Sequence, residues 1–222
     1  MKTQTETLRT ELIEMARLSQ RTVDYALKAH ESGRPEYVHH VGFGRDRLVC
    51  LNKKSCCATL EMRKSIRSVD TEVDFGEAIR TISVDLFDVC QHAYKISFLS
   101  VGFADCNVYE PPCYRVTMGA NINSAMRLCA VAIINNEVTH AEGARREIGY
   151  WRSVVAPTGP SGGDVKEPNH IGRCHECAIT RCMLKMMDNI YTIAVGFAAM
   201  VTADNNAPRR NTTETSRSSM PI

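Results

Sequence analysis

The sequence is poor in aromatic residues and nearly balanced in charge. Phenylalanine, tryptophan and tyrosine make up 6% of the 222 residues, and the formal net charge is +2. So small a net charge does not by itself imply a nucleic-acid partner, and we expect none. The ten cysteines fall well below the roughly 8–10% typical of small disulfide-linked secreted domains, and Met1 does not open a secretory leader. The composition therefore favours a reduced, cytoplasmic protein.

Long apolar runs and common catalytic motifs are also missing. A membrane-spanning helix needs roughly 18 or more apolar residues, and the longest candidate, 186–201, is interrupted by Asp188, Asn189 and Gly196. The sequence has no Gly-x-Ser-x-Gly elbow, no P-loop, and no Gly-x-Gly-x-x-Gly turn in the required strand-to-helix context. These absences predict a protein that is peripheral to a membrane at most and is not an enzyme.

Apolar residues recur at the spacing of helices throughout the chain. The clearest run advances in steps of four and three from Phe75 to Ile96, which is the heptad-like pattern of helix bundles. Glycine, proline and asparagine supply start and stop signals between such runs. Gly42 and Gly44 predict a kink or break in the second helix. The predicted helices cover residues 6–30, 35–64, 72–99, 112–135, 137–154 and 171–200, with a flexible loop over 156–169.

The third predicted helix is repeated in the sixth. An offset of 97 residues pairs Leu86 with Met183, Val89 with Met186, Tyr94 with Tyr191 and Ile96 with Ile193. The sequence therefore predicts an all-α fold made of a tandem pair of three-helix bundles. We place the first repeat at residues 1–104 and the second at 105–204, with a disordered tail over 205–222.

The repeated helices contain two recognisable motifs. Residues 85–97 read Asp-Leu-Phe-Asp-Val-Cys-Gln-His-Ala-Tyr-Lys-Ile-Ser, and residues 181–202 include Ile193-Ala194 and Met200-Val201-Thr202. The first segment resembles the PhoU family motif Asp-Leu-Glu-Arg-Ile-Gly-Asp-His-Ala, and the second is similar to the family's second copy, which ends Leu-Val-Thr-Gly-Glu. The resemblance covers residues 6 to 204.

This resemblance implies a six-helix, non-enzymatic regulator of phosphate uptake and of phosphate-starvation signalling. The implied partners are a phosphate ABC transporter ATPase and its sensor histidine kinase, and the implied assembly is a homodimer. Many family members also hold divalent metal or an iron cluster through Glu-x-x-x-Asp motifs on the third and sixth helices. Carboxylates four residues apart face one side of a helix and can share a hard cation.

Most of the matching positions in this chain have lost the carboxylate. Phe87 and Gln91 occupy the first motif, and Leu184 and Asp188 occupy the second. The corresponding positions of the partner helices hold Arg45, Val49, Ile148 and Arg152. Asp188 is thus the one remaining metal-ligand candidate. One carboxylate is too few for a polynuclear cluster, so we expect the family-type cluster to be absent and leave the cofactor unknown.

An alternative function is that of a metal-storing or metal-sensing helical bundle with Cys, His and Asp ligands. Its candidate site is Cys174-His175-Glu176-Cys177 together with Cys182. A Cys-x-x-Cys pair binds zinc when a second pair completes the site, whereas small sulfur side chains on one helix face commonly just pack.

Three further groups of residues favour structural explanations. The spacing of Met183, Met186 and Met187 predicts core residues, and Cys56 and Cys57 are expected to be small, half-buried residues that face apart. Asp85 and Asp88, three residues apart, are expected on a solvated helix face or at a helix contact.

Overall fold

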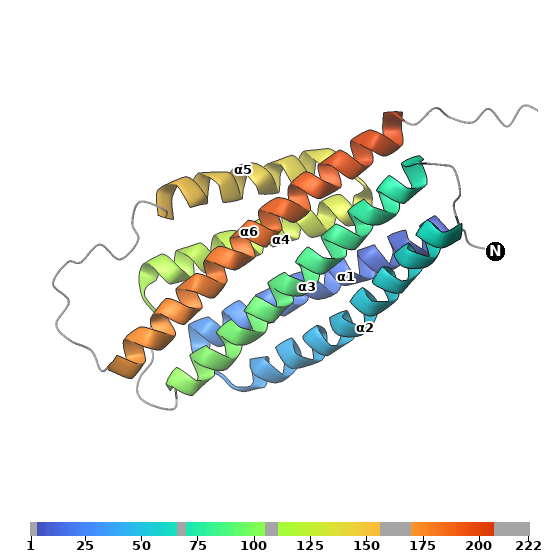
Figure 1. Ribbon diagram of the computed structural model, residues 1–222. Coiled ribbons are helices and arrows are strands. Elements are labelled where there is room, and N and C mark those ends of the chain that lie inside the picture. The colour runs from blue at the N-terminus through green and yellow to red at the C-terminus, as the bar shows by residue number, and fades with distance from the viewer. Residues whose placement is uncertain (1–3, 66–69, 105–110, 156–169, 207–222) are drawn as a thin grey trace, which may run out of the picture.

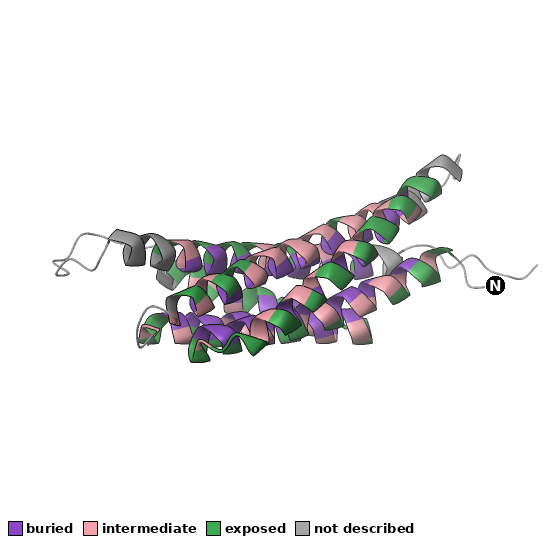
Figure 2. Cartoon of the chain, turned by 90° about the horizontal axis from the view of Figure 1, so that it is seen from below, coloured by how far each residue is buried: buried purple, intermediate pink, exposed green. Residues whose placement is uncertain are grey.

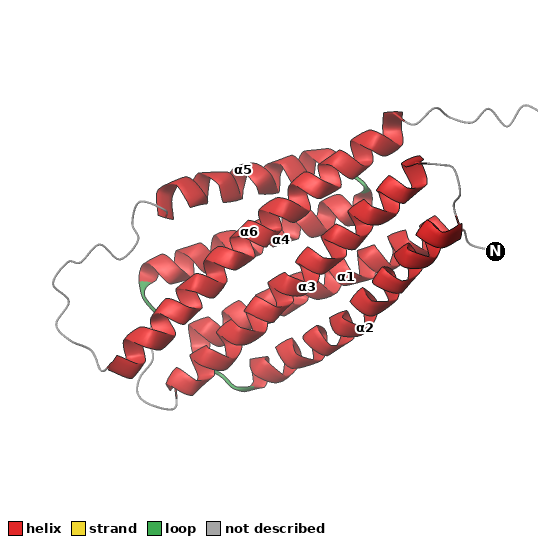
Figure 3. Ribbon diagram, in the orientation of Figure 1, coloured by secondary structure: helices red, strands yellow, loops and turns green. Residues whose placement is uncertain are grey.

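Six helices make up the described part of the protein. The computed structural model describes residues 4–65, 70–104, 111–155 and 170–206. Within those residues the chain forms no strand, and the all-α prediction is confirmed (Figure 3). The helices are α1 (Gln4–Ser32), α2 (Glu36–Ser65), α3 (Asp70–Ala104), α4 (Cys113–Asn135), α5 (Val138–Val155) and α6 (His170–Asn206).

The helices form two groups of three that lie side by side in an elongated bundle (Figure 1). In one group α1, α2 and α3 pack on one another, and in the other α5 packs on both α4 and α6. The groups meet where α3 lies along α6 and α1 lies along α4. The α3 and α6 helices are antiparallel, because Ile82 lies beside Gly196 whereas Leu99 lies near Ala178. The predicted pair of three-helix bundles is therefore found, with α2 and α5 flanking four central helices.

The periodic apolar residues of α3 lie in the core. Figure 2 shows the buried residues of the bundle on the sides of the helices that face one another. Each buried Leu, Ile or Val contributes about 1.5–3 kcal/mol by leaving water, and α3 has a long row of them. The row consists of Ile79, Ile82, Leu86, Val89, Ala93 and Ile96, each at most 1% exposed.

The repeated positions of α3 and α6 have matching environments. Leu86 and Met183 are both fully buried, and so are the other apolar pairs. Tyr94 and Tyr191 are both half-buried against the core. Met183, Met186 and Met187 are core residues, as the spacing predicts.

The predicted interruption of α2 at Gly42 and Gly44 is not found, because the helix continues from Glu36 to Ser65. A Cβ atom added to Gly44 would lie 2.3 Å from Oγ1 of Thr22 in α1. Gly44 therefore permits the close approach of α1 and α2. This tertiary contact outweighs the low helix propensity on which the prediction was based.

The helix ends follow the local signals in most places. Gly33, with φ at +67°, follows α1, and Asn136, with φ at 60°, ends α4 while its N–H donates to Ala132 O. Pro112 immediately precedes α4. Three helices are longer than predicted, since α1 extends from Gln4 to Ser32, α3 reaches Ala104 and α6 reaches Asn206. The tail predicted at 205–222 starts too early, because α6 continues to Asn206. The rest of that tail and the loop predicted at 156–169 lie outside the described residues.

Among the described residues, two segments are long and apolar enough to cross a membrane, Cys113–Asn135 and Cys177–Thr202, with a mean hydropathy of 1.2 in each. Of their most apolar windows, 50% and 44% of the residues are buried inside the bundle. Core helices of soluble proteins have the same properties, so the two segments are weak evidence for a membrane location.

Candidate functional site

Asp188, the predicted metal-ligand candidate, forms an ion pair with an arginine. It lies on α6, and its Oδ1 is 3.0 Å from Nη2 of Arg152 on α5. The Arg152 guanidinium also stands 5.3 Å from the centre of the Tyr191 ring. The positive charge beside Asp188 is thus supplied by a side chain, and a metal ion would have to compete with it.

The equivalent region of the first group contains an arginine in a similar place. The Arg45 guanidinium of α2 stands 4.2 Å from the centre of the Tyr94 ring on α3. Its Nε and Nη2 atoms donate to Oδ1 of Asp46 at 3.1 and 2.8 Å. Bonding to Asp46 is the main reason that the pKa of Arg45 lies above its ordinary value.

The remaining positions of the predicted metal motif cannot complete a site. Phe87 packs against the core, Gln91 is half-buried, Ile148 is fully buried and Leu184 is partly exposed. Among the described residues, no group of three or more His, Cys, Asp and Glu side chains is placed to hold a metal ion. The described residues therefore do not fit a family-type metal cluster. Asp188 as a metal ligand stays a prediction, which its ion pair does not support.

The cysteine cluster of the alternative function is described only in part. The side chains of Cys174, His175 and Glu176 lie outside the described residues, whereas Cys177 is exposed and Cys182 is buried. Burial is the main cause of a raised pKa at Cys182, and the nearby cations Lys95, Lys185 and Arg181 oppose it. A raised pKa disfavours the thiolate that zinc requires. Elemental analysis of the protein and of its Cys174→Ser/Cys177→Ser variant tests this site, and a metal-free parent would rule it out.

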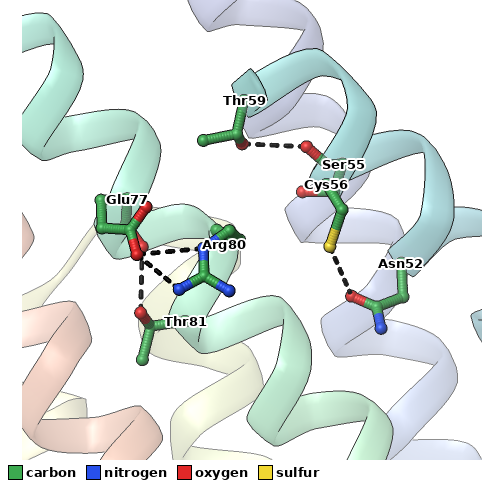
Figure 4. A network of polar contacts seen from close by, with 7 residues as sticks. All are labelled: Asn52, Ser55, Cys56, Thr59, Glu77, Arg80 and Thr81. Atoms are coloured by element: carbon green, nitrogen blue, oxygen red, sulfur yellow. Dashed lines mark hydrogen bonds and ion pairs between the residues drawn. The ribbon is translucent and has the colours of Figure 1, made fainter. Parts of the chain in front are cut away.

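Of the two adjacent cysteines, Cys56 is half-buried as the sequence predicts, whereas the prediction is wrong for Cys57, which faces solvent. Cys56 directs its thiol to Oδ1 of Asn52 at 3.7 Å on the same helix (Figure 4). On α3, Arg80 Nε donates to Glu77 Oε1 at 3.0 Å. These contacts lie within single helices, and we assign them no ligand.

A polar strip on α3 accompanies its contact with α6. Asp85, Asp88 and His92 lie on successive turns, where side chains three and four residues apart face one side. Burial, followed by the charge of Asp88, raises the pKa of Asp85 to about 6. Burial also lowers the pKa of His92, with Lys95 and Lys185 acting in the same direction and Asp88 against it. At neutral pH this strip holds carboxylates and an uncharged imidazole.

Beyond the polar strip, a shallow and open apolar hollow of about 300 Å³ lies between α3 and α6. The hollow is open to solvent, since the Phe98 side chain is 63% exposed. Its lining consists of Tyr94, Lys95, Phe98 and Leu99 from α3 and Ala178 and Cys182 from α6.

The sequence patterns do not predict this hollow. Tyr94 is one of the repeated residues and Cys182 belongs to the cysteine cluster, but nothing in either pattern brings the two together. The available signal was the spacing of Tyr94, Lys95, Phe98 and Leu99, which puts large side chains on the solvent-facing half of α3.

The fold and its surfaces define an all-helical protein of two joined three-helix groups. No protein-family model and no curated protein sequence matches the chain. Among solved structures, PhoU from Pseudomonas aeruginosa is similar over 90% of this chain and 94% of that chain, with a TM-score of 0.63 and 11% sequence identity. At this identity the similarity shows the fold alone. The chain thus has a PhoU-like fold over nearly its whole length.

Proposed function

We propose that this protein is a non-enzymatic regulator of phosphate uptake and of phosphate-starvation signalling. The observation that supports the proposal best is the PhoU-like fold, which extends over 90% of the chain. The motif resemblance at residues 85–97 and 181–202 supports it independently, because it was drawn from sequence alone.

The mechanism in this proposal is protein contact. The chain acts in the cytoplasm as two PhoU-like repeats, 1–104 and 105–204, within a homodimer. One face docks on a phosphate ABC transporter ATPase or on its sensor histidine kinase and favours one state of that partner. A ligand of this kind shifts an equilibrium by the difference between its affinities for the two states, and it needs no covalent chemistry.

The described residues support contact rather than a metal-dependent step. The position that retains a carboxylate, Asp188, is paired with Arg152. In this proposal, regulation works without the family-type cluster. A cell assay should accordingly give the same result whether or not iron is restricted.

The test is a strain that lacks the gene, with a phosphate-regulated reporter as the readout. We expect the reporter to be expressed even when phosphate is plentiful and to be repressed again by the parent chain. The unfolded control is Leu86→Asp, which places a charge at a fully buried position and should not restore repression. A pull-down with the purified ATPase and kinase provides the direct measurement. Unchanged reporter expression together with no binding to either partner would contradict the proposal.

A further inference from the structure

One wall of the α3–α6 hollow is held in place by α2. The Arg45 guanidinium stacks on the Tyr94 ring, and the Tyr94 ring lies 6.4 Å from the Phe98 ring in a stacked arrangement. On α2, a Cβ atom added to Gly42 would lie 3.8 Å from Cε2 of Tyr94. The aromatic wall is thus in position before any ligand arrives, which lowers the entropic cost of ordering these side chains on binding.

Three exposed cations stand around the hollow. The Lys95 side chain forms part of its lining, and Arg181 and Lys185 lie one turn apart on the facing helix. The charges of all three act on the Cys182 thiol, which places them close to that residue. Within the described residues none of the three has a carboxylate partner. Asp188, one turn from Lys185, is bound by Arg152 instead.

The opposite end of the α3–α6 contact keeps an arginine over a tyrosine, Arg152 over Tyr191, but has no counterpart of the three cations or of the exposed phenylalanine. The 97-residue offset relates Lys95 to Thr192, Phe98 to Val195 and Leu99 to Gly196. At that end Gly196 lies against Ile82, and the counterpart of Cys182 is the acidic Asp85. The fold by itself therefore does not create the hollow or its charge. Both come from side chains that one end of the contact has and the other lacks.

The size and openness of the hollow favour a protein segment over a small molecule. Small-molecule sites are typically about 300–1,000 Å³ and enclose most of their ligand. This hollow is at the lower limit and leaves Phe98 largely in solvent. It can accept one large apolar side chain, the usual anchor of a helix that binds in a groove. The surrounding cations call for carboxylates next to that anchor.

We infer that the hollow between α3 and α6, with Lys95, Arg181 and Lys185 around it, docks an acidic amphipathic helix of a partner protein. A leucine or phenylalanine of the partner enters between Phe98 and Cys182, and its neighbouring glutamates or aspartates pair with the three cations. The inference rests on the proposed function in that both require the chain to act by protein contact.

The test is direct binding of two designed helical peptides to the full chain, followed by fluorescence anisotropy. One labelled peptide has leucine every third or fourth residue with glutamate on the flanking positions, and the other has lysine in place of each glutamate. We expect the acidic peptide to bind and the basic peptide not to bind. Lys185→Glu and Phe98→Ser should each weaken binding roughly tenfold or more. Both positions are exposed, so the variants should fold, which circular dichroism checks.

Two further variants make the test specific. Arg145→Glu changes the charge of an exposed arginine on α5, away from the hollow, and should leave peptide affinity unchanged. The double variant Lys95→Glu/Lys185→Glu should lose the acidic peptide and gain the basic one. Equal binding of both peptides, or equal loss in Arg145→Glu and Lys185→Glu, would overturn the inference.

Measurements on the same protein samples also test two other possible occupants of the hollow, a second copy of the chain and a fatty acid. If the acidic peptide does not bind and Phe98→Ser lowers the mass of the free protein in sedimentation, the face is covered by a second copy and the inference is wrong. It is also wrong if only decanoate binds in a Phe98-dependent manner. Because these measurements need no signalling partner, they can fail while the reporter assay succeeds. Conversely, an unaffected reporter in the deletion strain contradicts the proposed function without altering the peptide result.

Discussion

The flanking helices of the two groups, α2 and α5, each place an arginine over the equivalent tyrosine of a neighbouring helix. Arg45 stacks on Tyr94 and binds Asp46 on its own helix. Arg152 is near Tyr191 and binds Asp188 on α6. The aromatic partner is thus the same in both groups, while the ion pair stays within one helix in the first group and joins two helices in the second.

This comparison separates what the bundle requires from what it tolerates. The half-buried tyrosines border the core, where shape and volume limit substitution. The carboxylates that pair with the two arginines lie at the surface, where replacing one carboxylate partner by another costs little free energy. Repetition therefore persists along the buried side of α3 and α6, and the exposed sides differ enough for one end to have the apolar hollow.

The largest expected effect tests whether the two groups are packed equally well. Leu86→Ala and Met183→Ala remove side chains from equivalent, fully buried positions, and each should lower the free energy of unfolding by about 2–5 kcal/mol. Urea unfolding followed by circular dichroism measures both. Leu60→Ala, at an exposed position of α2, is the control and should change stability by less than about 0.5 kcal/mol. A negligible effect of Met183→Ala would show that the second core is loosely packed.

The second prediction compares glycines in the two flanking helices. Gly44→Ala puts a Cβ atom 2.3 Å from Thr22 Oγ1. Thr22 then has to turn and lose its hydrogen bond to Leu18 O, or α1 and α2 have to separate, at a cost of about 1–3 kcal/mol. Gly149 of α5 has no atom within 4 Å of the added Cβ position among the described neighbours. Gly149→Ala should therefore stabilise the protein by about 0.5–1 kcal/mol through helix propensity. Thermal unfolding of both variants provides the measurement. If both substitutions raised stability, or both lowered it, the predicted difference between the two glycines would be wrong.

Signals that act within one helix were predictable from the sequence, whereas contacts between helices were not. Heptad spacing located the buried side of α3, and proline and asparagine signals located the ends of α4, because such signals act within a few residues. The break predicted at Gly44 was wrong because this glycine is required by its contact with Thr22, which lies on another helix. The hollow was missed for the same reason, since its lining joins residues far apart in the chain. The motif positions pointed to Asp188 as a metal-ligand candidate. Its carboxylate is paired with Arg152, and the sequence could not show this because only the packing of α5 on α6 brings the two residues together.

The third prediction uses the polar strip of Asp85, Asp88 and His92, which α3 has and α6 lacks. The pKa of Asp85 is about 6 in the folded protein and 3.8 ordinarily, so the folded state holds the proton more tightly. Stability contributed by this group is fully present below about pH 4, falls as the pH rises to about 6, and stays lower above that. Asp85→Asn should remove the fall, raising stability by about 1–2 kcal/mol at pH 8 and hardly at all at pH 4.

Unfolding of Asp85→Asn in urea at both pH values measures this change. The control is Glu142→Gln, at an exposed position of α5, which should be the same as the parent at both pH values. A gain from Asp85→Asn that is equal at the two pH values would indicate a packing effect instead. The charge of Asp88 would then have no part in it.

The smallest expected effect tests the difference between the two arginine pairs. A double-mutant cycle of Arg152→Ala and Asp188→Ala should give a coupling of about 0.2–1 kcal/mol, because the pair joins α5 to α6 while both side chains remain about half exposed. The Arg45→Ala and Asp46→Ala cycle should give less, since adjacent residues on one helix hold no second helix in place.

Urea unfolding at low and at high salt measures both couplings, and that of Arg152 with Asp188 should shrink at high salt. Metal content of the Arg152→Ala variant supplies a second readout. Removal of the guanidinium frees the Asp188 carboxylate, yet one carboxylate is a weak site for a divalent ion. We therefore expect no bound metal in this variant. Stoichiometric metal there would show that Arg152 blocks a working site, and that the second group differs from the first in having kept one.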